Sequence, residues 1–135
     1  MGAITWNPLF ESGDSTIDEQ HKSLVRTINR LEAAHSWGTG LKAMGFVLNE
    51  LETYTRSHFS TEERLFVKIG FPEADAEEHI AEHRQFIETV ASLRREFEKG
   101  DEAAVTRLLG VLGDWFVHHV ANVDLKYRPY LSKPA

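Results

Sequence analysis

The chain has 135 residues, of which 41% are hydrophobic and 27% charged, with a formal net charge of −6 at pH 7 and no cysteine. This length predicts a single domain, residues 1–135, that buries a core without cross-links, and the missing cysteines exclude disulfides, thiolate ligands and a cysteine nucleophile. The negative charge argues against nucleic acid as the main partner, and no apolar run approaches the roughly 18 residues of a membrane span.

An irregular arm is expected at the start of the chain, over residues 1–16. Pro8, Gly13 and scattered polar residues interrupt any regular pattern there. Trp6 and Phe10 are the aromatic side chains of this segment. We predict that they anchor the arm to the rest of the molecule.

Four long amphipathic segments follow the arm, with apolar residues at intervals of three and four. We predict helices over residues 17–35, 41–69, 74–99 and 101–120, with a shorter helical piece to residue 131. Glycine and proline in the short connections end the helices. Short connections make sequential helices antiparallel neighbours. The predicted fold class is therefore all-α, an antiparallel up-down-up-down four-helix bundle with an N-terminal arm and a short C-terminal helical extension.

Seven side chains that can bind metal occupy positions on these helices where leucine or isoleucine is expected. They are His21, His58, Glu62, His79, His83, His119 and Asp124. Counted from the predicted turns, the histidines of neighbouring helices lie within about three residues of the same height, a few ångströms at roughly 1.5 Å per residue. His58 with Glu62, and His79 with His83, are pairs four residues apart, so both members of a pair can reach one centre.

A layer of seven polar groups needs a binding partner inside an apolar bundle. Each unsatisfied buried polar group costs about 1–3 kcal/mol, so seven cost on the order of 10 kcal/mol, which is the net stability of a whole domain. Mutual hydrogen bonds satisfy only part of a set of five histidines and two acids. The layer therefore predicts a site for a pair of metal ions.

Asp124 is the least regular member of the set, because it follows His119 by five residues, about 140° around an ideal helix. Both side chains face the core only if the helix bulges or tightens between them, and we predict this irregularity around residues 121–123. Asp124 alone is equally consistent with a solvated surface acid. His35 and His118 do not fit the layer, and we expect both at the surface or in a second layer around the site.

In these motifs the chain resembles the haemerythrins, most closely the single-domain bacterial haemerythrins. The matching stretches are IDEQHK at 17–22, HFSTEE at 58–63, HIAEH at 79–83 and HVANVDLKY at 119–127. Trp6 also resembles the tryptophan of the family's N-terminal arm. Each motif alone is common on charged helices, but their combination is specific and covers nearly the whole chain.

The resemblance implies a non-haem di-iron centre in which two iron ions share an oxo or hydroxo bridge. One iron would be held by three histidines and the other by two, with both carboxylates bridging. The first set is His79, His83 and His119, the second is His21 and His58, and the bridging residues are Glu62 and Asp124. The second iron would be one ligand short, and dioxygen would bind end-on at that vacancy.

The resemblance also implies an apolar pocket for oxygen beside the irons. Residues at the positions of Phe59, Trp115, Phe116 and Val120 line this pocket in the family. Such a shell excludes water and slows oxidation of the centre. The same four residues are equally expected as ordinary core. Tyr127, three residues after the second bridging acid, is a further candidate to contact a metal-binding side chain.

Two functions follow from this centre. The first is reversible dioxygen binding for transport, storage or sensing, with dioxygen, or another small ligand such as nitric oxide, as the partner of a cytoplasmic monomer that contacts neither nucleic acid nor membrane. The alternative is a di-iron enzyme with oxidase, peroxidase or nitric oxide reductase-like activity. Five histidines against two acids favour binding over oxidation, because neutral nitrogen ligands stabilise high-valent iron less than carboxylates do.

Two further hypotheses remain open on the sequence. The segment 79–83 fits the H-x-x-E-H pattern of some zinc peptidases, although such enzymes are larger and need a distant third ligand. A purely structural or signalling bundle is the other.

Overall fold

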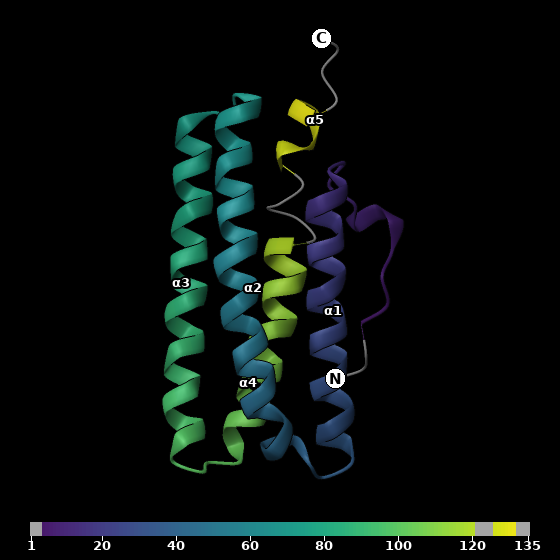
Figure 1. Cartoon of the computed structure of the whole chain (residues 1–135), viewed down its shortest axis with the longest axis vertical. Helices are drawn as coiled ribbons and strands as arrows, with labels where there is room; N and C mark the ends of the chain where they lie inside the picture. Colours follow the sequence, from purple (N-terminus) through teal and green to yellow (C-terminus); the bar gives the residue numbers. More distant parts are fainter. Residues whose placement is uncertain (1–3, 121–125, 132–135) are drawn as a thin grey trace.

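The computed structural model describes residues 4–120 and 126–131. In chain order it contains the 3-10 turn η1 (Pro8–Phe10), the helices α1 (Ser15–Ser36), α2 (Gly40–Ile69), α3 (Glu73–Glu98) and α4 (Ala103–Trp115), the π-helical turn η2 (Phe116–Val120) and the short helix α5 (Arg128–Leu131). Figure 1 shows the four long helices side by side, with the α1–α2 and α3–α4 connections at one end and α5 at the other. The predicted all-α bundle with its arm and helical extension is confirmed. Among the helices so described, none is long and apolar enough to cross a membrane.

The predicted bounds of the first three helices agree with the structure to within two residues. The fourth differs, because α-helical geometry begins at Ala103 and gives way after Trp115 to a π-helical turn. At its start, the Asp101 carboxylate accepts a hydrogen bond from the Ala103 backbone N–H at 3.0 Å. Asp101 therefore supports the beginning of this helix as its side-chain chemistry predicts.

Polar and glycine residues set the ends of the helices. Asp14 caps α1 by accepting a hydrogen bond from the Ile17 backbone N–H at 3.0 Å. Gly70 ends α2 with φ at 70°, in the left-handed region, and the next residue, Phe71, donates its N–H to the Phe66 carbonyl at 3.0 Å. A glycine adopts this conformation without the steric cost that a Cβ would bring.

Two apolar clusters fill the bundle, one on each side of the candidate histidines. The larger contains Leu24, Ile28, Leu31, Met44, Val47, Leu48, Leu51, Phe86, Val90, Leu93, Leu108 and Leu112, among others. The smaller contains Ile17, Phe66, Phe71 and Tyr127. Along α1, Ile17 belongs to the smaller cluster and Leu24 to the larger, with His21 between them. The histidine layer therefore divides the core.

The N-terminal arm is attached through its backbone and its aromatic rings. The Ile4 N–H donates to Asn29 Oδ1 at 2.7 Å, and Asn29 Nδ2 donates to the Ile4 carbonyl at 2.8 Å. The rings of Trp6 and Phe10 pack edge to face with centroids 5.7 Å apart, and Phe10 packs the same way on Phe116 at 5.0 Å. The predicted anchoring by Trp6 and Phe10 is confirmed, and the arm reaches the π-helical turn.

Two glycine substitutions test the account of the α2 terminus. We expect Gly70→Ala to lower the free energy of unfolding by about 1–2 kcal/mol, because alanine is strained at positive φ. Gly110→Ala is the matched control, since Gly110 lies within α4 and no atom approaches within 4 Å of its added Cβ. That substitution should raise stability by about 0.5–1 kcal/mol. Urea unfolding followed by circular dichroism measures both, and a stabilising Gly70→Ala would contradict the assignment.

Candidate metal centre

The helices α1, α2 and α3 and the π-helical turn after α4 bring candidate ligands to one buried layer. α1 contributes His21, α2 contributes His58 and Glu62, α3 contributes His79 and His83, and η2 contributes His119. All six side chains are at most 2% exposed. Their ligand atoms form two groups, each lying within 4.8 Å of one another: Glu62, His79, His83 and His119 in one, and His21, His58 and Glu62 in the other. The predicted convergence of these six residues is present in the structure.

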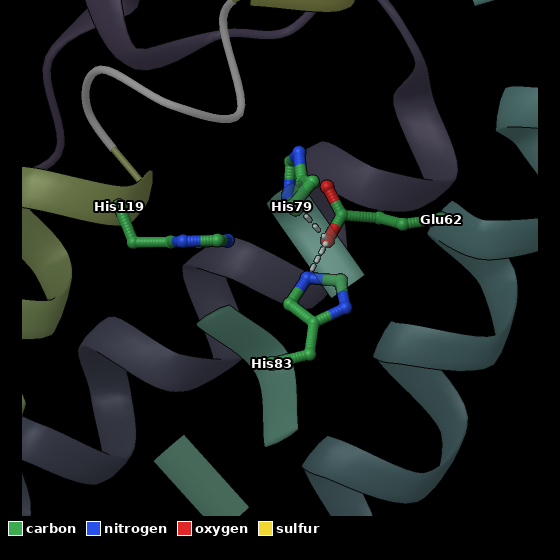
Figure 2. Close-up of side chains that lie close together, drawn as sticks. All are labelled: Glu62, His79, His83 and His119. Carbon is green, nitrogen blue, oxygen red and sulfur yellow. Dashed lines mark ion pairs between the residues drawn. The ribbon is translucent and has the colours of Figure 1, made fainter. Parts of the chain in front are cut away.

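Glu62 belongs to both groups. Its Oε1 lies 3.1 Å from His58 Nε2, 3.2 Å from His83 Nε2 and 3.8 Å from His79 Nε2. Figure 2 shows its carboxylate directed at His79 and His83, with His119 reaching inward from the opposite side. One carboxylate between two sets of imidazoles is the geometry that a residue bridging two cations requires.

The histidine rings turn a common edge toward the centre. His21 Nε2 and His58 Nε2 lie 3.0 Å apart, and the Nε2 atoms of His79 and His83 face Glu62. The Nδ1 atoms of several of these rings point outward to hydrogen-bond acceptors. A proton fixed on Nδ1 leaves a lone pair on Nε2, which is the form that binds a metal ion. The donor set and its orientation therefore fit a metal site.

Three acceptors on the outside of the layer hold the rings in this orientation. Gln20 Oε1 accepts from His58 Nδ1 at 2.6 Å, Glu63 Oε2 from His83 Nδ1 at 3.3 Å, and Glu82 Oε1 from His119 Nδ1 at 3.0 Å. Sequence reasoning did not assign these three residues. A signal was available, because each stands one position from a predicted ligand in the chain.

Tyr127 completes the surroundings of Glu62. Its side chain is fully buried, and its hydroxyl donates a hydrogen bond to Glu62 Oε2 at 2.7 Å. The prediction that Tyr127 contacts a metal-binding side chain is confirmed. The bond restrains the second carboxylate oxygen while the first lies among the histidines.

Aromatic rings stack on three histidines of the layer. Phe59 stacks on His83 with centroids 3.8 Å apart, and Trp115 stacks on His119, also at 3.8 Å. Tyr54, which sequence reasoning missed, stacks on His58 at 4.9 Å. Of the predicted pocket residues, Phe59 and Trp115 therefore lie on the three-histidine group. Phe116 is buried and packs against the N-terminal arm.

Some predicted residues lie elsewhere. His35 and His118 are exposed, as expected. Asp124, the irregularity expected at 121–123 and the side chain of Val120 lie outside the described part of the chain. A departure from α-helical geometry is nevertheless present one turn earlier, because Phe116–Val120 is π-helical. The wider turn carries His119, and such turns are frequent at functional sites.

Comparison with known proteins assigns the family. The model of the Hemerythrin HHE cation binding domain matches residues 12–131. The chain belongs to the haemerythrin family. It is 35% identical to a bacteriohemerythrin of Pseudomonas aeruginosa over 127 residues, 94% of this chain and 80% of the relative. It is 31% identical to a bacteriohemerythrin of Methylococcus capsulatus over 133 residues, 98% and 99% of the two chains.

Solved structures agree with this haemerythrin assignment. A crystal structure of a haemerythrin point mutant superposes with a TM-score of 0.80 at 29% identity, covering 98% of this chain and all of the other. A hemerythrin-like protein of Naegleria gruberi is 31% identical over 128 residues, 95% of this chain and 93% of the relative. The haemerythrin resemblance inferred from the motifs is thus confirmed along almost the whole chain.

Removal of a central ligand tests the metal site. We expect Glu62→Ala and His119→Ala to weaken Co²⁺ binding roughly 100-fold or more. Each substitution removes one metal ligand from the layer, and the remaining ligands cannot complete the coordination of the ion. His118→Ala is the matched control, since this exposed histidine adjoins His119 in the chain. Titration of the metal-free proteins, followed by cobalt absorption, measures the affinities. Equal affinity in all three variants would refute the site.

Proposed function

We propose that this chain binds dioxygen reversibly at a non-haem di-iron centre and serves as an oxygen carrier, store or sensor. The observation that carries the proposal is the unequal division of histidines around one shared carboxylate. Three imidazoles lie with Glu62 in one group and two in the other. Membership of the haemerythrin family supports iron as the metal.

In this proposal the two groups hold one iron each. His79, His83 and His119 would bind the first, and His21 and His58 would bind the second. Glu62 would be shared by the two irons, and the family resemblance assigns Asp124 the same role. When bound, the iron pair would supply two electrons and a position for dioxygen. Glu62 Oε1 lies closest to His58 and His83, one from each group, which supports its bridging role.

The side chains around the centre exclude water from it and restrain its ligands. Phe59 and Trp115 lie flat against His83 and His119, and Tyr127 restrains Glu62 through its hydroxyl. A shell of aromatic rings keeps water from the layer. Rings held by acceptors on Nδ1 cannot turn, so the site stays arranged for binding when its ligand leaves.

The di-iron enzyme remains the alternative, and the same centre would serve it. A zinc peptidase is not supported, because Glu82, the acid of the H-x-x-E-H pattern, accepts a hydrogen bond from His119 Nδ1 at 3.0 Å. It is therefore engaged in holding a ring and is not placed as a general base. A single haemerythrin-like domain, its monomeric state and its cytoplasmic location stay predictions.

Reversible binding of dioxygen distinguishes an oxygen carrier from a di-iron enzyme. The protein should bind two irons per chain, and exposure of the anaerobically reduced form to air should produce a visible absorption band. Purging with argon should return the reduced spectrum, because dioxygen leaves intact. Absorption spectroscopy with an iron assay measures this. Irreversible oxidation, or decay of the band only when an added substrate is consumed, would favour the enzyme instead.

Trp115 should control the lifetime of the oxygenated form. Together with His119, it lines a surface cavity of about 300 Å³, and its ring lies flat against this histidine. We expect Trp115→Ala to admit water and speed oxidation of the iron severalfold or more. Trp37→Ala is the control, since Trp37 is 84% exposed at the end of α1. An unchanged decay rate in Trp115→Ala would show that the ring does not shield the centre.

A further inference from the structure

The outer hydrogen bonds of the layer follow the order of the chain. A residue on α1 holds a histidine of α2, a residue on α2 holds one of α3, and a residue on α3 holds one of η2. The three acceptors are Gln20, Glu63 and Glu82. Each of them is the immediate sequence neighbour of a candidate ligand, so α1, α2 and α3 each supply a ligand to the layer and also hold a ring of the next helical segment.

The three acceptors differ in charge. Gln20, behind the two-histidine group, is a neutral amide, whereas Glu63 and Glu82, behind the three-histidine group, are carboxylates. We propose that Glu82, assisted by Glu63, is a positioning residue whose negative charge makes the three-histidine iron the more readily oxidised of the pair. This inference rests on the proposed di-iron function.

The physical reason is the strength of the hydrogen bond to Nδ1. A carboxylate acceptor draws the Nδ1 proton more strongly than an amide does, which places more electron density on Nε2 and makes the imidazole a stronger donor. A stronger donor and a nearby negative charge both favour the ferric over the ferrous ion. An amide acceptor orients its ring equally well without adding charge.

The two carboxylates differ in their distance from the histidine nitrogen that each accepts from. Glu82 lies 3.0 Å from His119 Nδ1, and Glu63 lies 3.3 Å from His83 Nδ1. Their side chains are similarly exposed, 35% and 38%, so solvent screens both to a similar degree. The shorter bond of Glu82 therefore carries the larger part of the effect. Both charges remain partly hydrated, which avoids the cost of a fully buried unpaired carboxylate.

Glu82→Gln isolates the charge from the hydrogen bond, because its amide oxygen can still accept from His119. We expect this variant to bind two irons and to fold as the parent does. The ferric form of the three-histidine iron should lose about tenfold in stability relative to the ferrous form. This raises the reduction potential of that iron by about 59 mV, and the mean of the two potentials by about half as much. Glu82→Ala removes the hydrogen bond as well and should lower metal affinity roughly 10–100-fold.

Gln20→Glu supplies the opposite test. A carboxylate placed behind His58 should lower the mean potential while iron content stays at two per chain. Glu78→Gln is the matched control, because Glu78 is exposed on α3 and also stands one residue before a candidate ligand. It removes the same charge at a position that holds no histidine ring, so its potential should follow the parent's.

Spectroelectrochemical titration of the iron-loaded proteins, with an iron assay on each, decides the matter. Opposite shifts for Glu82→Gln and Gln20→Glu, with Glu78→Gln unchanged, support the proposal. A potential in Glu82→Gln equal to that of Glu78→Gln would overturn it, as would loss of iron from Glu82→Gln, since the amide should keep the ring in place. Failure of the parent itself to bind iron would instead refute the proposed function.

Discussion

The structure depends on one buried carboxylate. Glu62 is fully buried among imidazoles, where an isolated negative charge costs several kcal/mol. The Tyr127 hydroxyl satisfies one of its oxygens, and the other faces nitrogen atoms on α2 and α3. A carboxylate in such a place is stabilised by a cation beside it, and neutral histidines are ligands that hold one. The need for that charge explains why histidines from four helical segments interrupt an otherwise apolar core.

Long helices are the means of bringing these groups to one level. His21 and His58 lie 37 residues apart in the chain, and His58 and His83 lie 25 apart, yet antiparallel packing brings them into one layer. The polar layer adds little hydrophobic stabilisation, so apolar clusters above and below it carry the bundle. The arm strengthens the same region, because Phe10 packs on Phe116 beside the turn that carries His119.

Periodicity was sufficient to predict the helices and the six described ligand candidates, because a core-facing position and a height follow from residue counting alone. It could not predict Gln20, Glu63 and Glu82. These residues flank the core-facing positions, and their contacts depend on how neighbouring helices are rotated. Residue counting at 3.6 residues per turn also fails in a π-helical turn, which contains more residues per turn. The irregularity predicted at 121–123 from the spacing of His119 and Asp124 lies outside the described residues, and the described departure from α-helical geometry begins at Phe116.

The hydrogen bonds from each helix to a histidine of the next helical segment also link metal binding to the packing of the helices. Because Glu63 adjoins Glu62, and Glu82 adjoins His83, a ligand and the acceptor that holds another ligand share one stretch of helix. Displacing one ligand therefore moves an acceptor and loosens a ring on the next helix. Metal binding and helix packing are coupled through these shared segments. A site assembled in this way resists partial loss of its ligands, because α1, α2 and α3 cannot leave the layer without releasing a histidine of the next helical segment.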